Sequence, residues 1–184
     1  MKKKLIILLV FITLFIYRQE IFNLLVKYRE IKIVPEQQLT NSITKNEIDS
    51  FIKSYDWLGV EELNNLLLKY TKKTLKFGAK PSTNDINKFT KGTKTHCVGY
   101  AAFHNSILNY VFRSLNMEDY KATHERGIIR FLEINLNKLS NSAFYKNHDY
   151  IKIENTKTGK YFYCDPSLYE FTRIRYIGKI KFKK

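Results

Sequence analysis

Three side chains suited to nucleophilic catalysis, Cys97, His148 and Asp165, follow one another in the second half of the sequence. Apolar residues recur at helical intervals from Cys97 to Asn116, which predicts a long helix that begins at the cysteine. Unpaired amide hydrogens and the helix dipole stabilise a thiolate at such an end, and the same amides can hold a developing oxyanion. Most free cysteines are small buried hydrophobic residues, so Cys97 alone indicates little.

Two segments after this helix predict a β-hairpin that would carry the other two groups. His148–Glu154 and Tyr161–Asp165 alternate in the manner of strands, and the polar, glycine-containing segment 155–160 joins them. If Glu154 pairs with Tyr161, the imidazole of His148 lies one diagonal step from the carboxylate of Asp165 on the same face. A carboxylate in that position orients an imidazole as a general base and stabilises its protonated form. A register slip of one residue would separate the two side chains.

The order and spacing of these segments resemble the transglutaminase-like superfamily. Segment 95–101 (THCVGYA) resembles the nucleophile segment of that family, 148–153 (HDYIKI) the strand that bears the base, and 159–167 (GKYFYCDPS) the segment that ends in the orienting aspartate. The resemblance implies a papain-like Cys-His-Asp fold in a bacterial-type, membrane-anchored member. The family usually has a small residue and then tryptophan after the histidine, where this chain has Asp149 and Tyr150.

The resemblance also implies the chemistry. Cys97 would attack an amide carbonyl of a protein or peptide substrate, His148 would move the proton, and Asp165 would hold the imidazole. Water as acyl acceptor makes a peptidase or amidase, and a lysine amine makes a crosslinking enzyme; we expect hydrolysis, because nothing in the sequence specifies an amine-acceptor site. The family commonly uses an upstream side chain as a second oxyanion donor, for which Trp57 is the candidate here, with a core tryptophan as the alternative. No cofactor is expected.

The remaining histidines and the second cysteine predict structural roles. His96 precedes the nucleophile and is expected on a surface loop or at the rim of a cleft. His104 lies about 10 Å along the helix from Cys97, too far for proton transfer, and is expected in the core. His124 is expected to be exposed, and Cys164 to face the core rather than pair with Cys97. These spacings match no zinc site, and no acidic cluster indicates calcium, so we expect no metal.

The other elements indicate an α+β domain with helices packed on one side of an antiparallel sheet. Helices are expected after a capping box at Thr44 and Glu47, and over Val60–Leu75, before an irregular loop over Phe77–Lys94. Strands are then expected at Tyr120–His124, Ile128–Ile134 and Phe171–Phe182, besides the hairpin. The apolar residues on the reverse face of the hairpin should pack on the helices: Ile151, Ile153, Phe162 and Cys164. With 44% hydrophobic residues the chain can fill such a core.

The N-terminal segment predicts a membrane address. Three lysines precede an apolar run over Leu5–Tyr17, and no small residues follow that would mark a cleavage site. We therefore expect an uncleaved signal anchor over 1–26, a linker over 27–43, and the domain over 44–184 on the extracytoplasmic side of the membrane as a single-pass protein. A buried amphipathic helix, or a cleaved signal with a poor site, is the alternative.

The formal net charge of +15 suits an anionic partner. An envelope polymer or lipid head groups would fit, and a solvated, lysine-coated surface is the alternative explanation. Nucleic-acid binding is not expected, because the chain carries an export signal and no nucleic-acid motif. The alternative to an enzyme is therefore a non-catalytic, basic binding module of the same fold, which docks on envelope polymer or on a protein partner.

Overall fold

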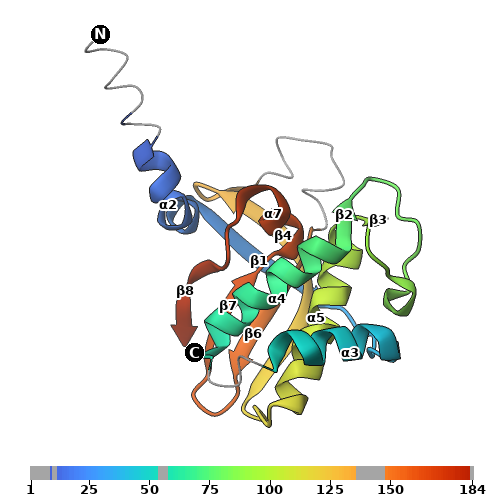
Figure 1. Ribbon diagram of the computed structural model, residues 1–184. Coiled ribbons are helices and arrows are strands. Elements are labelled where there is room, and N and C mark those ends of the chain that lie inside the picture. The colour runs from blue at the N-terminus through green and yellow to red at the C-terminus, as the bar shows by residue number, and fades with distance from the viewer. Residues whose placement is uncertain (1–8, 10–11, 54–57, 136–147, 183–184) are drawn as a thin grey trace.

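The computed structural model describes residues 9, 12–53, 58–135 and 148–182 (Figure 1). Its elements, in chain order, are α2 (Arg18–Leu25), β1 (Val26–Ile33), α3 (Ser42–Ile52), α4 (Val60–Thr74), β2 (Leu75–Phe77), the 3-10 helix η1 (Ile86–Lys88), β3 (Thr93–Thr95), α5 (Cys97–Ser114), β4 (Tyr120–Phe131), β5 (Ile134–Asn135), β6 (His148–Asn155), β7 (Lys160–Cys164), α7 (Pro166–Thr172) and β8 (Ile177–Phe182).

Among the described residues, one large antiparallel sheet has the strand order β1-β4-β6-β7-β8, and the short β5 pairs with β4. The outer strands β1 and β8 contact each other, so the sheet is curled. β6 and β7 form the predicted hairpin in the predicted register, with Glu154 opposite Tyr161 and Ile151 opposite Cys164. A separate pair of short parallel strands, β2 and β3, leads into α5.

The core lies between this sheet and α5, which is buried along most of its length. The small residues Ala101 and Ala102 let α5 approach β4 and β6, and α4 packs against α5 (Figure 1). On the sheet side, the core contains the reverse-face residues of the hairpin that the sequence predicted: Ile151, Ile153, Phe162 and Cys164. The predicted mixed architecture, helices against an antiparallel sheet, is confirmed at this level.

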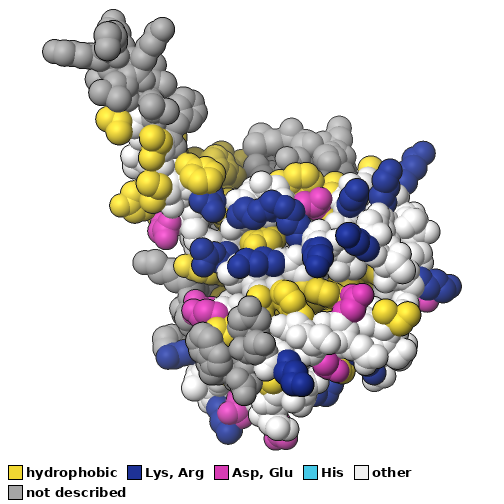
Figure 2. All heavy atoms as spheres, viewed as in Figure 1, with side chains coloured by type: hydrophobic (Ala, Val, Ile, Leu, Met, Phe, Trp, Pro, Cys, Tyr) yellow, Lys and Arg dark blue, Asp and Glu magenta, His cyan; other side chains and the backbone are white. Residues whose placement is uncertain are grey.

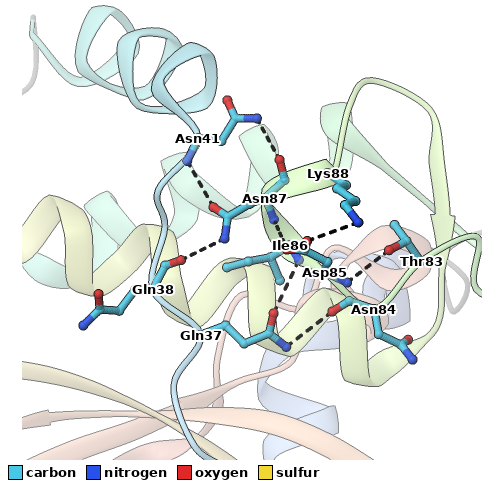
Figure 3. Close-up of polar contacts among 9 residues, drawn as sticks. All are labelled: Gln37, Gln38, Asn41, Thr83, Asn84, Asp85, Ile86, Asn87 and Lys88. Atoms are coloured by element: carbon cyan, nitrogen blue, oxygen red, sulfur yellow. Dashed lines mark hydrogen bonds and ion pairs between the residues drawn. The ribbon is translucent and has the colours of Figure 1, made fainter.

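A polar network fastens the chain between β1 and α3 to the loop around η1 (Figure 3). Asn87 lies at its centre, and its Oδ1 accepts from the backbone amides of Thr40 at 2.7 Å and Asn41 at 3.1 Å. Its Nδ2 donates to the carbonyl oxygen of Gln38, and the Nδ2 of Asn41 donates back to the Asn87 carbonyl oxygen. Asn41 also caps α3 by accepting from the amide of Thr44, so the helix begins at Ser42 and is capped by an asparagine rather than by the predicted capping box.

The segment expected to be a linker differs from the prediction. Its first half forms β1, which pairs with β4 along its length, so the folded unit begins before residue 44. The preceding helix α2 also packs on the domain: Arg18 Nε donates to the Thr172 carbonyl oxygen at 3.2 Å, and the Asn23 side chain accepts from Gly178 N at 3.0 Å. Local composition does not predict pairing between distant segments. Here pairing with β4 makes this polar stretch an edge strand.

Part of the predicted anchor over 1–26, residues 1–8 and 10–11, lies outside the described residues. Among the residues that are described, no helix combines the length and the apolar content needed to cross a bilayer.

Candidate active site

Cys97 is the first residue of α5, as predicted. His96 caps this helix, because its Nδ1 accepts from the Val98 amide at 3.3 Å. Gly99 is required in the first turn, since a Cβ atom there would collide with the side chain of Thr95. The nucleophile candidate therefore sits on a closely packed turn, and its side chain is 7% exposed.

His148 and Asp165 meet across the hairpin in the diagonal arrangement that the sequence predicted. His148 begins β6, and Asp165 follows directly after β7 as the cap of α7. Their side chains are joined by a hydrogen bond between His148 Nε2 and Asp165 Oδ2. Both are buried, with exposed fractions of 0% and 1%. A buried ion pair needs further hydrogen bonds to be favourable, and Asp165 has them.

The carboxylate of Asp165 accepts from groups on three elements. Oδ1 accepts from the Ser167 hydroxyl at 2.7 Å and the Leu168 amide at 2.9 Å, while Oδ2 accepts from Tyr28 at 2.8 Å besides His148. Burial alone would raise the pKa of Asp165, but the charge and hydrogen bonds of His148, with Leu168 and Ser167, lower it. Asp165 is therefore held as an anion.

Cys97 interacts with the same imidazole. Burial acts to lower the pKa of His148, but the charge and hydrogen bond of Asp165, and then those of Cys97, raise it to about 10. Because Nε2 binds Asp165, a proton exchange between His148 and the thiol would use Nδ1. The structure thus brings the three predicted residues together in the order Cys97, His148, Asp165. An imidazole that is held by a carboxylate can act as a general base toward a thiol.

Tyr28 of β1 is part of this site and was missed by the sequence analysis, which placed it in a linker. Besides its bond to Asp165, its ring lies 5.9 Å from that of His148 and 4.7 Å from that of Tyr150. Burial, followed by the charge and hydrogen bond of Asp165, raises the pKa of Tyr28 well above its usual value, so the hydroxyl stays protonated as a donor. Gly127, opposite His148, has no room for a side chain against Arg29 and Tyr150.

The helix after Asp165 was also missed, although its signal was present. The sequence predicted a strand from Phe171, whereas Pro166–Thr172 form α7 and β8 begins at Ile177. An aspartate followed by proline is a typical helix start, with aspartate as the cap and proline at the first helical position. This helix start supplies the Leu168 amide that binds Asp165.

A second buried ionic cluster lies beside the first, on the reverse face of β4 and β6. Asp149 accepts from His124 Nε2 at 2.8 Å and from Arg126 Nε at 3.1 Å. Burial would raise the pKa of Asp149, but His124 and Arg126 lower it. The prediction that His124 is exposed is wrong, because β4 runs without interruption through both predicted strands and turns this residue toward Asp149, where it is 2% exposed.

The other predicted positions have structural roles. His104 is buried between Thr71 Oγ1 at 2.9 Å and Asn64 Oδ1 at 3.0 Å, and burial lowers its pKa to about 3. Cys164 lies in the core as predicted, and neither it nor Cys97 forms a disulfide. Trp57, the oxyanion candidate, lies outside the described residues. Across the part of the chain that the structure describes, no three His, Cys, Asp or Glu side chains are grouped to hold a metal ion.

Comparisons with protein-family models, with curated proteins and with solved structures found no match to this chain.

Proposed function

We propose that this protein is a transglutaminase-like cysteine enzyme that acts on amide bonds through an acyl-enzyme. The observation that carries the proposal is the position of His148, between the thiol of Cys97 and the buried, fully hydrogen-bonded carboxylate of Asp165. The helix start at Cys97 adds backbone amides at the point where an oxyanion would develop.

In the proposed reaction the Cys97 sulfur attacks the carbonyl carbon of the substrate and forms a C–S bond. The protonated His148 then gives its proton to the leaving amine as the C–N bond breaks, which leaves a thioester. Water attacks the thioester carbon while His148 takes a proton from it; the C–S bond breaks, the carboxylic acid leaves, and the thiolate–imidazolium pair is restored. Asp165 and, through it, Tyr28 keep the imidazole oriented throughout. With an amine in place of water the same steps would form a crosslink; we favour hydrolysis.

The N-terminal segment belongs to the same proposal. Residues 12–16 are helical and expose large apolar side chains, of which Phe15 is 68% and Ile16 is 62% exposed. Together with the lysines before them, these side chains support a membrane anchor that holds the domain at the extracytoplasmic surface. The anchor is then shorter than the predicted span over 1–26, because α2 packs on the domain and Val26 begins β1.

Alkylation of the full chain by iodoacetamide over a pH series tests the catalytic reading. We expect Cys97 to react faster than an ordinary thiol across the series, and we expect the difference to be lost in the His148→Ala variant, because the imidazole activates the thiol. Cys164, which is 0% exposed, is the internal control and should stay unmodified in the folded protein. Peptide mapping distinguishes modification of Cys97 from modification of Cys164.

Two outcomes would overturn the proposal. One is a Cys97 rate that follows an ordinary thiol and does not change in the Asp165→Asn variant. The other is a wild-type chain that neither hydrolyses fluorogenic peptide amides nor transfers their acyl group to an amine, under conditions where Cys97→Ala is equally inactive. Hydrolysis that is lost in Cys97→Ala, with no amine incorporation, would support the peptidase or amidase reading.

The basic surface supports a binding module as the second candidate. Figure 2 shows many lysine and arginine side chains on the viewed face, and exposed ones on α4 and after α7 include Lys69, Lys73, Arg173 and Arg175. Binding of an anionic polymer that is unchanged in Cys97→Ala and weakens steeply with salt, in a chain without turnover, would select this function over the enzyme.

A further inference from the structure

The tip of the β4–β5 hairpin exposes a group of large apolar side chains. Phe131, Leu132 and Ile134 are 39%, 57% and 51% exposed, and Leu24, which precedes Leu25 on α2, is 77% exposed. The Leu132 amide donates to the Leu25 carbonyl oxygen at 2.8 Å, which fixes the tip against the end of α2. We call these four residues, Leu24, Phe131, Leu132 and Ile134, the apolar corner. Single exposed apolar residues are ordinary, but a contiguous group marks an interaction surface.

The backbone of the tip holds its leucine outward in an unfavourable conformation. Leu132 and Glu133 have φ angles of +49° and +64°, the left-handed region that asparagine and glycine adopt in tight hairpins. A polar or glycine residue at position 132 would suit both the turn and water better. The leucine therefore points to an apolar partner rather than to the local fold.

Cations border the apolar corner on a chain whose formal net charge is +15. Lys27 and Arg130 both form ion pairs with Glu133, and the exposed Glu20 lies one turn before Leu24 on α2. The local charges are therefore mixed, and the positive charge that suits an anionic surface is that of the whole chain. The exposed apolar helix of residues 12–16 leads away from the same side of the domain, as Figures 1 and 2 show. An apolar patch that is bordered by cations and continuous with an apolar helix fits the interface of an anionic lipid bilayer.

We infer that the apolar corner inserts into the interfacial region of a bilayer that contains anionic lipid. The inference rests on the proposed membrane location and not on the proposed chemistry. It has a consequence for the site, because Phe131 pairs with Val26, two residues before Tyr28 on β1. Docking of the corner would hold β1, and with it the Tyr28 donor to Asp165, in a fixed position relative to the membrane.

Tryptophan reporters in the full chain test the inference on vesicles of phosphatidylcholine and phosphatidylglycerol whose acyl chains are brominated near the glycerol. Leu132→Trp and Ile134→Trp place reporters at the corner. Ile43→Trp, at a 70% exposed position on α3, is the matched control. The signal of Trp57 is removed by subtracting that of the wild-type chain. We expect brominated lipid to quench both corner reporters and to leave the control unchanged, and we expect less quenching without phosphatidylglycerol.

A further substitution separates docking from misfolding. Leu132→Asn suits the left-handed backbone and removes the apolar side chain, so the melting temperature should stay the same or rise. When it is combined with the Ile134→Trp reporter, it should abolish the quenching of that reporter. Corner reporters that are quenched no more than the control would overturn the inference, as would a full chain that does not float with the vesicles. Cys97→Ala should leave the quenching unchanged, so failure of the proposed chemistry and failure of docking give different results.

Discussion

Replacing Asp165 with asparagine removes one charge from a buried ion pair while it keeps the size of the side chain. One oxygen remains to accept from Ser167 and Leu168, so the cap of α7 is preserved. What changes is the partner of His148 Nε2 and of the Tyr28 hydroxyl, which both face a neutral amide instead of the carboxylate oxygen. The substitution therefore removes the charge on which the candidate site depends, and only the coupling to His148 makes its effect vary with pH above neutrality.

The magnitude follows from the pKa of His148, which is raised from 6.5 to about 10. A shift of this size corresponds to about 5 kcal/mol of net stabilisation of the protonated form, in which the interactions with Asp165, and then those with Cys97, outweigh the opposing effect of burial. Because the folded-state pKa lies above the unfolded one, this stabilisation is fully present below pH 6.5 and is lost as pH rises through about 10. We expect the free energy of unfolding of Asp165→Asn to be lower by several kcal/mol near pH 6.

The assay is urea denaturation of the wild type and the variant at a series of pH values, with the difference between them plotted against pH. Other titrating groups cancel in this difference, so it should shrink by about 1.4 kcal/mol per pH unit at most as His148 loses its proton. Asp119→Asn is the matched control, because Asp119 forms an exposed ion pair with Lys157 at 2.9 Å. Its difference should be flat and below about 1 kcal/mol.

A difference between wild type and Asp165→Asn that does not vary over this pH range would refute the reasoning, since it would mean that the carboxylate does not hold a proton on His148. If the variant fails to fold, the His148 resonances of the wild type decide the matter by NMR. An imidazole that titrates near pH 6.5 in the folded wild type contradicts the prediction just as clearly.

Three further changes have defined outcomes. Burial raises the pKa of Glu125 from 4.5 to about 7, so the folded protein loses stability as pH rises through that range. In urea denaturation, Glu125→Gln should therefore raise the free energy of unfolding by about 3 kcal/mol near pH 8 and change it little near pH 4. Asn87→Ala removes the acceptor of the amides of 40–41, which are exposed or half-buried, and should cost about 0.5–1.5 kcal/mol by the same assay. Tyr28→Phe removes a donor to the charged Asp165 and should cost about 1.5–3 kcal/mol at neutral pH, less once acid protonates the carboxylate.

Local patterns in the sequence were enough for the parts of the site that depend on neighbours along the chain. The alternation of apolar and polar residues on both sides of segment 155–160 sets the register of the hairpin, because a strand turns successive side chains to opposite faces. That register places His148 beside Asp165. Helical periodicity likewise located the start of α5 at Cys97, since the burial of one helix face repeats with the helical turn.

The tertiary structure decided which contacts between distant segments complete the site, although the family resemblance had already grouped Cys97 with His148 and Asp165. No local pattern connects Cys97 to His148, which lies on another element, or Tyr28 to Asp165; these contacts exist because α5 packs on β6 and because β1 pairs with β4 in a curled sheet. The same pairing makes His124 a buried partner of Asp149, although its charged neighbours in sequence suggest a surface residue. Residue types and spacing determine what a short segment can form, whereas burial and charge pairing between distant segments depend on how the whole chain packs.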